Sequence, residues 1–300
     1  MFTAVLVFML IEKNRLNLND KINKYLPSKM LENLFVYKGI DYSNNVTIMN
    51  LLGHTSGCSD YFEDKVIKGN KFKNVFFSEP DKFWTPEMTL EFVQNNQKAV
   101  GKPSECFHYS DTSYNLLGKI VEFITNRTFQ ENLHDLIFNH LQMDDTYLMY
   151  RSVPKNEIKS IEKIWLKNRE ISNYKSLSCD WAGGGIISTV SDLLKFSLAL
   201  QNGKLINNEL LTLMKEPIRK YRNGMYYGLG QMSINFKEMT FNLVRNLPNF
   251  YGHSGLFSTQ LYYEPNTNVH IIINLGIAEL MAINSCFSIM IEINKEITKK

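Results

Sequence analysis

Residues 107–118 read Phe-His-Tyr-Ser-Asp-Thr-Ser-Tyr-Asn-Leu-Leu-Gly, a polar stretch that runs directly into an apolar pattern. Asp111 is of a residue type that caps helices, because its side-chain oxygen can accept a hydrogen bond from a free backbone N–H. Apolar side chains then recur at helical spacing, at Tyr114, Leu117, Ile120, Val121 and Ile124. The stretch therefore predicts an amphipathic helix capped by Asp111.

The first residues form a second apolar segment. Residues 2–11 are nearly all apolar and are followed by Glu12 and Lys13. The run is about half as long as a membrane span and lacks the charged start and cleavage site of a secretory signal. It predicts a helix over 2–14 that is buried on all sides. No capping residue precedes Phe2, so we expect that upstream sequence is missing.

The rest of the chain divides into a helical part and a strand part. Residues 59–105 predict a long irregular excursion with helices near 60–68 and 89–97. Past about residue 226, strands are predicted at 227–235, 251–262 and 269–275, and a closing helix at 278–297. We expect one α+β domain over residues 1–300, with a helical lobe at about 1–215 and a sheet lobe with the closing helix at about 216–300.

Composition excludes several classes of protein. The 300 residues are 44% hydrophobic, which is too high for a disordered chain, and the net charge is only +3. The basic residues are scattered, so no nucleic-acid partner is predicted. The four cysteines are far apart and no HExxH pair occurs, so we predict neither a metal nor a cofactor.

Four short segments carry the chemistry: residues 51–57 (LLGHTSG), 109–118 (YSDTSYNLLG), 182–196 (AGGGIISTVSDLLKF) and 252–255 (GHSG). In this order and spacing they resemble the serine β-lactamase-related family, which includes penicillin-binding proteins, class C β-lactamases, D-alanyl-D-alanine peptidases and esterase relatives. The resemblance implies a serine hydrolase that forms an acyl-enzyme. Its substrate, a small molecule or a peptide, would be an amide or ester, such as a D-alanyl peptide, a β-lactam or a small ester.

The second motif supplies the predicted catalytic residues. By resemblance, Tyr109 matches the Tyr of Y-x-N and would transfer protons once a nearby cation lowers its pKa. Asp111 takes the Asn position, where it keeps an acceptor but adds a charge and removes the amide donor. The stretch can also be aligned as S-D-N, with Ser110 and Asp111 followed by Thr112. We prefer Tyr109 because the third motif begins with His, as in relatives that use Tyr.

The third motif supplies the predicted substrate-binding and oxyanion residues. His253, Ser254 and Gly255 match H-x-G on a strand that lines the family's site. Gly255 would let the backbone approach the substrate closely. Leu256 would then offer its backbone N–H to the oxyanion, by analogy with the residue after K-T-G.

The nucleophile motif S-x-x-K is not found where the family has it, at the start of a buried helix just before a stretch like residues 1–4. Ser160 and Lys163 have the spacing, but their segment is polar and does not begin an apolar helix, so we interpret it as chance. The fold is therefore expected to lack the family's N-terminal helix and first strands, and the chain to be inactive as written. The alternative is a catalytically dead binding module that keeps the pocket.

Overall fold

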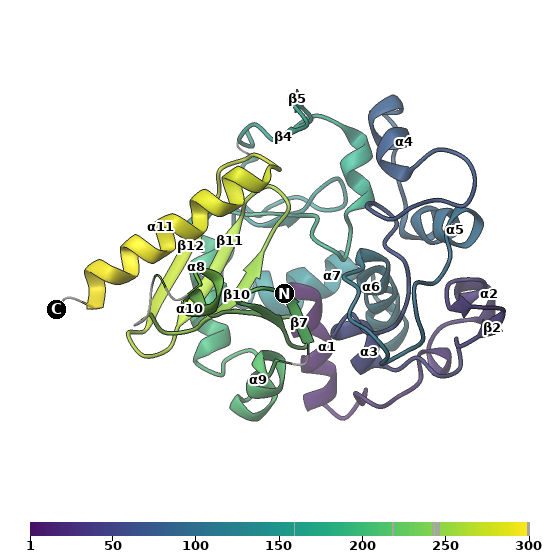
Figure 1. Ribbon diagram of the computed structural model, residues 1–300, viewed down its shortest axis with the longest axis horizontal. Coiled ribbons are helices and arrows are strands. Elements are labelled where there is room, and N and C mark those ends of the chain that lie inside the picture. The colour runs from purple at the N-terminus through teal and green to yellow at the C-terminus, as the bar shows by residue number, and fades with distance from the viewer. Residues whose placement is uncertain (159, 218, 242, 244–246, 299–300) are drawn as a thin grey trace.

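The computed structural model describes residues 1–158, 160–217, 219–241, 243 and 247–298. Figure 1 shows a sheet with a long helix at one side of the molecule, short helices at the other side, and the first helix between them. The predicted α+β class is confirmed. Where the helical lobe and the sheet lobe divide remains a prediction. Among the described residues no helix is long and apolar enough to cross a membrane.

Most of the helices lie in the first 215 residues. They are α1 (Phe2–Glu12), α2 (Ser28–Leu31), α3 (Ile48–Leu52), α4 (Phe72–Ser78), α5 (Pro86–Asn96), α6 (Asp111–Thr125), α7 (Phe129–Leu133), α8 (Val190–Gln201), α9 (Asn208–Lys215), α10 (Phe236–Met239) and α11 (Leu280–Thr298). Shorter turns are the 3₁₀ segments η1 (Ile22–Lys24) and η3 (Lys175–Cys179) and the π-helical η2 (His134–Phe138).

The main sheet is an antiparallel meander with strand order β12-β11-β10-β9-β8-β7. Its strands are β7 (Arg219–Arg222), β8 (Met225–Tyr227), β9 (Met232–Ile234), β10 (Phe250–Ser254), β11 (Gln260–Glu264) and β12 (Val269–Ile273). Three two-stranded pairs lie outside it: β1 (Val36–Tyr37) with β2 (Ile40–Asp41), β3 (Tyr147–Leu148) with β6 (Ile186–Ile187), and β4 (Trp165–Leu166) with β5 (Arg169–Glu170).

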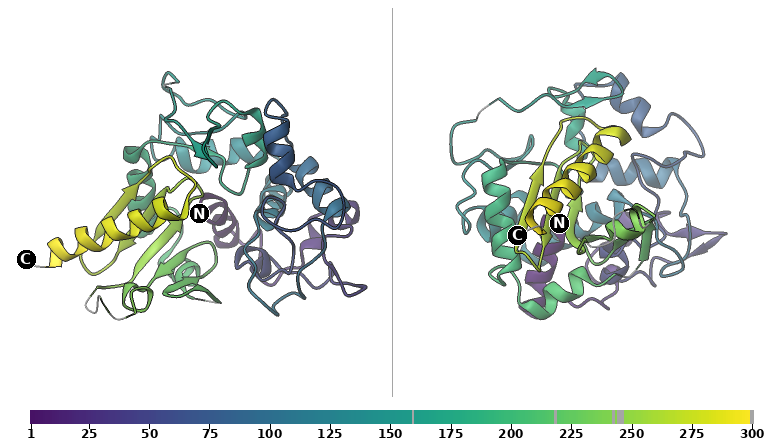
Figure 2. Two further views of the ribbon diagram at one scale, coloured as in Figure 1. Left: turned by 45° about the horizontal axis from the view of Figure 1, so that its top comes forward. Right: turned by 60° about the vertical axis from the view of Figure 1, so that its left-hand side comes forward.

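The sheet separates two apolar cores because successive side chains of a strand point to opposite faces. Leu261 packs in the core that α1, α6 and α8 share, whereas Tyr262 packs in the core under α11. Figure 2 shows α11 lying along the outer side of the sheet. The inner face of the sheet is therefore turned toward the helical half of the chain, where the site lies.

Helix α1 occupies the centre of the molecule, as its apolar sequence predicts. Residues 3–8 are all buried, and the helix packs against α6 and α7. No side chain caps its start. Such burial on every face explains why the segment has no polar stripe.

Some local predictions are wrong for identifiable physical reasons. Residues 60–68 form turns and bends instead of a helix, and the Asp60 carboxylate accepts hydrogen bonds from the N–H groups of Phe62 and Glu63 in the first of these turns. The strand predicted at 251–262 is a hairpin of β10 and β11, and the one at 227–235 is split into β8 and β9. A turn at Gly230, whose φ is +93°, separates the latter two.

Candidate active site

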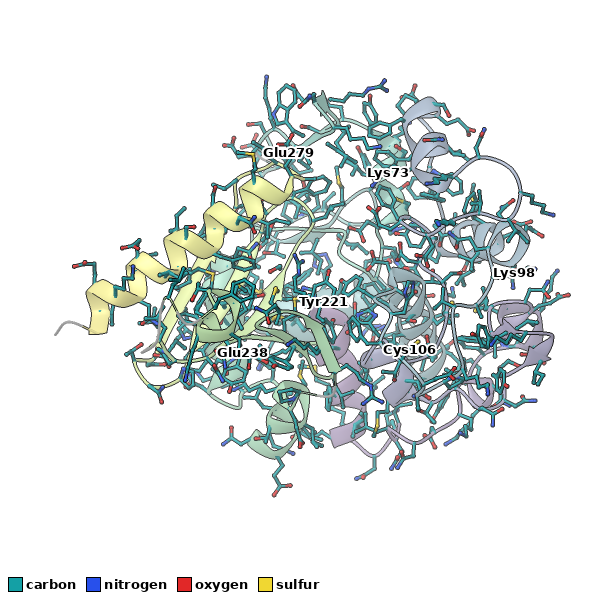
Figure 3. All side chains as sticks on the ribbon, viewed as in Figure 1. Lys73, Lys98, Cys106, Tyr221, Glu238 and Glu279 are labelled. Carbon is teal, nitrogen blue, oxygen red and sulfur yellow. The ribbon has the colours of Figure 1, made fainter. Side chains whose placement is uncertain are left out.

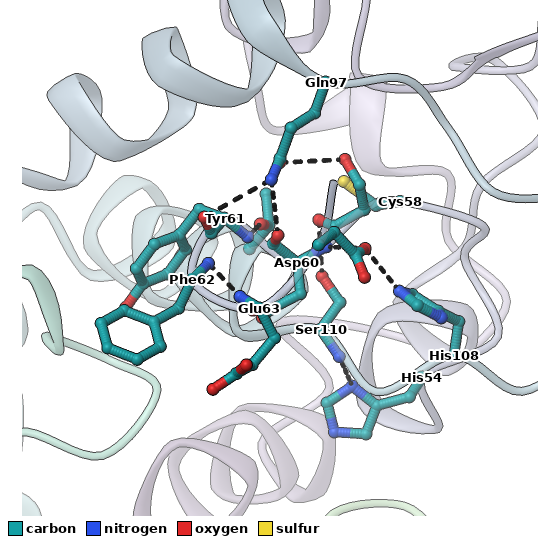
Figure 4. Close-up of polar contacts among 12 residues, drawn as sticks. His54, Cys58, Asp60, Tyr61, Phe62, Glu63, Gln97, His108 and Ser110 are labelled. Atoms are coloured by element: carbon teal, nitrogen blue, oxygen red, sulfur yellow. Dashed lines mark hydrogen bonds and ion pairs between the residues drawn. The ribbon is translucent and has the colours of Figure 1, made fainter. Parts of the chain in front are cut away.

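The start of α6 is held by residues that sequence reasoning assigned differently. Ser110, and not Asp111, is the N-cap: its hydroxyl accepts from Ser113 N–H and donates to the Ser59 carbonyl at 3.0 Å. Asp111 is the first helical residue instead. Ser110 N–H donates to His54 Nδ1 at 3.0 Å, and Figure 4 shows this contact beside those of Asp60. The Ser110 hydroxyl is buried in these bonds, whereas Tyr109 lines the cavity described below. Which of the two residues transfers protons remains a prediction.

Tyr109 lies where the helix start meets the sheet. Its ring stacks on His54 with centroids 4.2 Å apart and lies 6.3 Å from the ring of His253 on β10. The Tyr109 pKa lies well above its ordinary value because of burial, and Asp111 raises it further. A phenol in this setting keeps its proton at neutral pH, so it becomes a base only when a cation is placed beside it.

His253 is an uncharged residue that lies beside Tyr109. Its Nε2 lies 3.0 Å from the Tyr227 hydroxyl, and its Nδ1 lies 2.8 Å from the Ser254 carbonyl oxygen. A carbonyl can only accept, so Nδ1 carries the proton and Nε2 accepts from Tyr227. Burial lowers the pKa of His253 to about 3, so the ring stays uncharged at neutral pH.

The rest of the third motif closes β10 and begins a turn, whereas the sequence suggested the start of a strand. The Ser254 hydroxyl donates to Gln260 Oε1 at 2.6 Å, and Gly255 N–H donates to the Thr259 carbonyl at 2.7 Å. Leu256 is exposed and lines the cavity. Its role as an oxyanion donor remains a prediction.

Two carboxylates flank one glycine beside these residues. A Cβ on Gly183 would lie 3.0 Å from Asp180 Oδ1 and 3.2 Å from Asp111 Cγ, so a side chain there would displace both carboxylates. Burial raises the pKa of Asp111 well above its ordinary value, and the neighbouring Asp60 and Asp180 raise it further. Burial likewise raises the pKa of Asp180 to about 7, with Asp60 as a further cause.

One cavity of about 1280 Å³ lies between these elements, and Asp180 and Gly183 are among the residues that line it. Tyr109, Asp111 and residues 253–256 are brought together there, along with Met1 and Tyr221. Figure 3 labels Tyr221 near the middle of the view, between the strands and the helices of the N-terminal half. Within the described part of the chain, no group of His, Cys, Asp and Glu has an arrangement that could hold a metal ion.

The S-x-x-K spacing occurs at three places. Besides Ser160 and Lys163, it occurs at Ser152–Lys155 and Ser172–Lys175. Ser160 and Lys163 line the cavity but lie outside any helix, and Lys163 pairs with Glu170 at 3.3 Å. The other two pairs do not line the cavity. None of the three serines begins an α-helix, as a nucleophile of this family would.

Sequence reasoning missed Asp180, whereas the segment LLGHTSG favours a structural role for His54. The sequence offers one weak indication of Asp180, which is its position three residues before the glycine triplet. The structure explains this triplet in part, because a Cβ on Gly185 would come within 1.8 Å of the Asp180 carbonyl oxygen. His54 is fully buried between Tyr109 and Tyr114, and burial lowers its pKa well below the ordinary value. It positions the segment before α6 as an uncharged acceptor.

Curated relatives match a large part of the chain. Penicillin-binding protein 4* of Bacillus subtilis (strain 168) is 27% identical over 254 residues, which cover 79% of this chain and 51% of that protein. Protein flp of Staphylococcus aureus (strain MW2) is 29% identical over 148 residues, covering 48% of this chain and 26% of that protein. The chain thus spans about half the length of the first of these relatives, and less of the second.

Solved structures share the fold. A D-stereospecific amidohydrolase from Streptomyces sp. superposes with a TM-score of 0.77 at 21% identity, covering 95% of this chain and 82% of that one. A D-amino acid amidase from Ochrobactrum anthropi SV3 gives 0.76 at 20% identity, covering 98% and 83%. A penicillin binding protein from Bacillus halodurans gives 0.71 at 20% identity, covering 96% and 82%.

The family description "Beta-lactamase" matches residues 1–281, a range that contains all four motifs and every cavity-lining residue except Ile283. The fold agrees, since 95% of the chain superposes on the Streptomyces amidohydrolase with a TM-score of 0.77. The chain therefore belongs to the β-lactamase family.

Proposed function

We propose that the cavity is the acyl-transfer centre of a serine hydrolase that acts on an amide or an ester. The observation that supports this best is the meeting of Tyr109 and His253 at one cavity, with ring centroids 6.3 Å apart. The two side chains come from motifs that are distant in the chain, and each motif supplies the residue type that acyl transfer needs.

The roles follow from the protonation states. Tyr109 would take the proton of the attacking hydroxyl and return it to the leaving group once a neighbouring cation lowers its pKa. His253 stays neutral and keeps the wall beside Tyr109 in place through its bond with Tyr227. The Leu256 N–H would stabilise the oxyanion at the other side.

Residues 1–300 do not contain the family's nucleophile motif, a Ser-x-x-Lys that begins a buried helix. None of the three S-x-x-K pairs begins a helix at the cavity. We therefore propose that this 300-residue chain forms no acyl-enzyme by itself. Met1 lines the cavity, and the charge of Asp111 acts on the pKa of its amino group. A residue joined ahead of Met1 would therefore enter the site.

The second candidate is a binding module. The same cavity, without a helix-borne Ser and Lys in residues 1–300, could hold a small molecule or a peptide without cleaving it. The solved structures of similar fold include amidases and a penicillin binding protein, which favours an amide, ester or β-lactam as the ligand in either case.

Acylation by a fluorescent penicillin separates the candidates. Two proteins are compared: the 300-residue chain, and the chain extended by a helical turn Ser-x-x-Lys whose Lys directly precedes Met1. We expect a one-to-one adduct on the extended form and none on the 300-residue chain. An adduct on the shorter chain would show that one of its own serines is the nucleophile. No adduct on a correctly folded extended form would favour the binding module.

A further inference from the structure

The loop over residues 56–61 is bonded to four consecutive residues at the start of α6. The pairs of loop and helix residues, at 2.7–3.1 Å, are Ser56 with Ser113, Ser59 with Ser110, Asp60 with Asp111, and Tyr61 with Thr112. Asp60 makes the only charged contact of the four, and its partner is the helix backbone itself. The other three contacts can hold loop and helix together when Asp60 is changed.

The Asp60 carboxylate uses both of its oxygens. Oδ2 accepts from Asp111 N–H at 2.7 Å, while Oδ1 accepts from Phe62 N–H at 2.9 Å and from Glu63 N–H at 2.7 Å. Asp111 is the first residue of α6, so its N–H has no acceptor within the helix. An amide has one accepting oxygen and one donating nitrogen. Only a carboxylate at this position can therefore hold the loop turn and the helix start together.

This arrangement is unfavourable for the fold in another respect. Asp60 is only 4% exposed, and burial raises its pKa, while the hydrogen bond from Asp111 N–H lowers it. Its charge also raises the pKa of Asp111 and that of Asp180. Burying one more carboxylate beside two others opposes folding. Features that oppose folding locally are found mainly at functional sites, where they serve the site's geometry.

The same loop holds the chain on both sides of Tyr109. After Tyr109, Asp60 fixes the backbone of Asp111. Before it, His108 Nε2 lies 2.7 Å from Asp64 Oδ2, and that oxygen also accepts from Asp60 N–H at 2.7 Å. Figure 4 shows Asp60 and His108 within this network. The position of the Tyr109 ring at the cavity thus depends on a loop that contributes no group to the proposed proton transfer.

Resting on the proposed function, we infer that Asp60 is a positioning residue for Tyr109: its carboxylate fixes the start of α6 and thereby keeps the Tyr109 phenol in place at the cavity. Asp60 acts through backbone N–H groups and exchanges no proton with a substrate. The effect of losing it on turnover can still be large, because a misplacement of about 1 Å can lower a rate about a hundredfold.

Hydrogen exchange in the 300-residue chain tests the central contact without catalysis and without a variant. An N–H at the first position of a helix has no acceptor in that helix, so it normally exchanges readily with water. Val190, the exposed first residue of α8, is the control. After correction for intrinsic rates, we expect Asp111 N–H to exchange about a hundredfold more slowly than Val190 N–H. Equal rates would overturn the inference.

Two matched variants test the position of the ring. Asp192 is a comparably buried carboxylate in the first turn of α8 that accepts from Asp145 N–H at 3.0 Å. In tyrosine-labelled protein, the ring resonance of Tyr109 should shift in Asp60→Asn but not in Asp192→Asn, and that of Tyr114 should stay in place in both. An unshifted Tyr109 resonance in folded Asp60→Asn would overturn the inference. If Asp60→Asn does not fold, the exchange of Asp111 N–H still decides.

Kinetics in the extended form separate positioning from a merely structural role. We expect Asp60→Asn to lower kcat about tenfold to a hundredfold and to change KM by less than about threefold. In a chain that already carries Tyr109→Phe, the same change should lower kcat by less than about threefold, because the group that Asp60 positions is gone. Equal losses in both backgrounds would overturn the inference. Absence of acylation would refute the hydrolase alone, since exchange and the Tyr109 resonance are measured without it.

Discussion

Replacing Asp180 by Asn should stabilise the protein at about pH 8 and have little effect at about pH 4. The Asp180 carboxyl is buried near Asp60, and its pKa rises from 3.8 to about 7 on folding. The folded state therefore holds this proton more tightly than the unfolded state does. As the pH rises from about 4 to about 7, the unfolded chain releases the proton first, so the carboxyl lowers the stability of the fold progressively.

The size of the effect follows from the shift. Each unit of pKa corresponds to about 1.4 kcal/mol, so the shift of about three units costs the folded state about 4 kcal/mol once the carboxyl is ionised. The amide that replaces this carboxyl in the variant carries no such charge at any pH. We expect the free energy of unfolding of Asp180→Asn, relative to the parent, to increase by about 4 kcal/mol between pH 4 and pH 8.

Urea denaturation of parent and variant across this pH range measures the difference, and groups that do not interact with Asp180 cancel. Asp41→Asn makes the same change of charge on an exposed side chain and serves as the control. Curves for Asp180→Asn and the parent that stay parallel, within about 1 kcal/mol over the whole range, would refute the reasoning that Asp180 is buried without a counter-charge.

Three further predictions concern the elements that position the site. Ser110→Ala removes the N-cap of α6 and should cost about 1–2 kcal/mol in urea denaturation, whereas an unchanged midpoint would contradict that capping role. Gly185→Ala places a Cβ 1.8 Å from the Asp180 carbonyl oxygen, so we expect a loss of several kcal/mol and a clearly lower melting temperature. In the extended form, His253→Ala should reduce turnover by less than the loss of the Tyr109 hydroxyl does, because His253 lines the site without moving a proton. A larger loss of turnover in His253→Ala than in Tyr109→Phe would contradict these two roles.

Local signals in the sequence predict much of the fold. Thr47, Thr128 and Asn207 each accept from a backbone N–H near the start of the helix that follows, so these helices could be predicted from a few residues. The apolar run at residues 2–11 likewise predicts the buried α1. The boundaries inside the sheet are harder to predict. The residues around Gly230 have the pattern of one strand, but the positive φ of Gly230 ends that strand in the structure.

The site is predictable only in part, for a similar reason. Tyr109 and His253 stand in short motifs whose residue types already indicate acyl transfer. Asp180 depends on a contact between its own segment and Gly183–Gly185, which no periodicity in the sequence reveals. No described residue pairs with the Asp180 carboxylate, and this can be recognised only in the folded structure, where the helices and the sheet enclose the cavity.

The most direct test of the hydrolase is the turnover of two matched variants in the extended form with its Ser and Lys. Tyr109→Phe and Tyr114→Phe each remove one hydroxyl from a ring that stacks on His54. Of the two residues, only Tyr109 lines the cavity. The Tyr114 hydroxyl donates instead to the Leu52 carbonyl at 3.2 Å. With an amide or ester substrate, we predict that Tyr109→Phe lowers turnover by roughly 10²–10⁴ without lowering the melting temperature, and that Tyr114→Phe changes turnover little. Full turnover in Tyr109→Phe would contradict the assignment of Tyr109 as the group that transfers the proton.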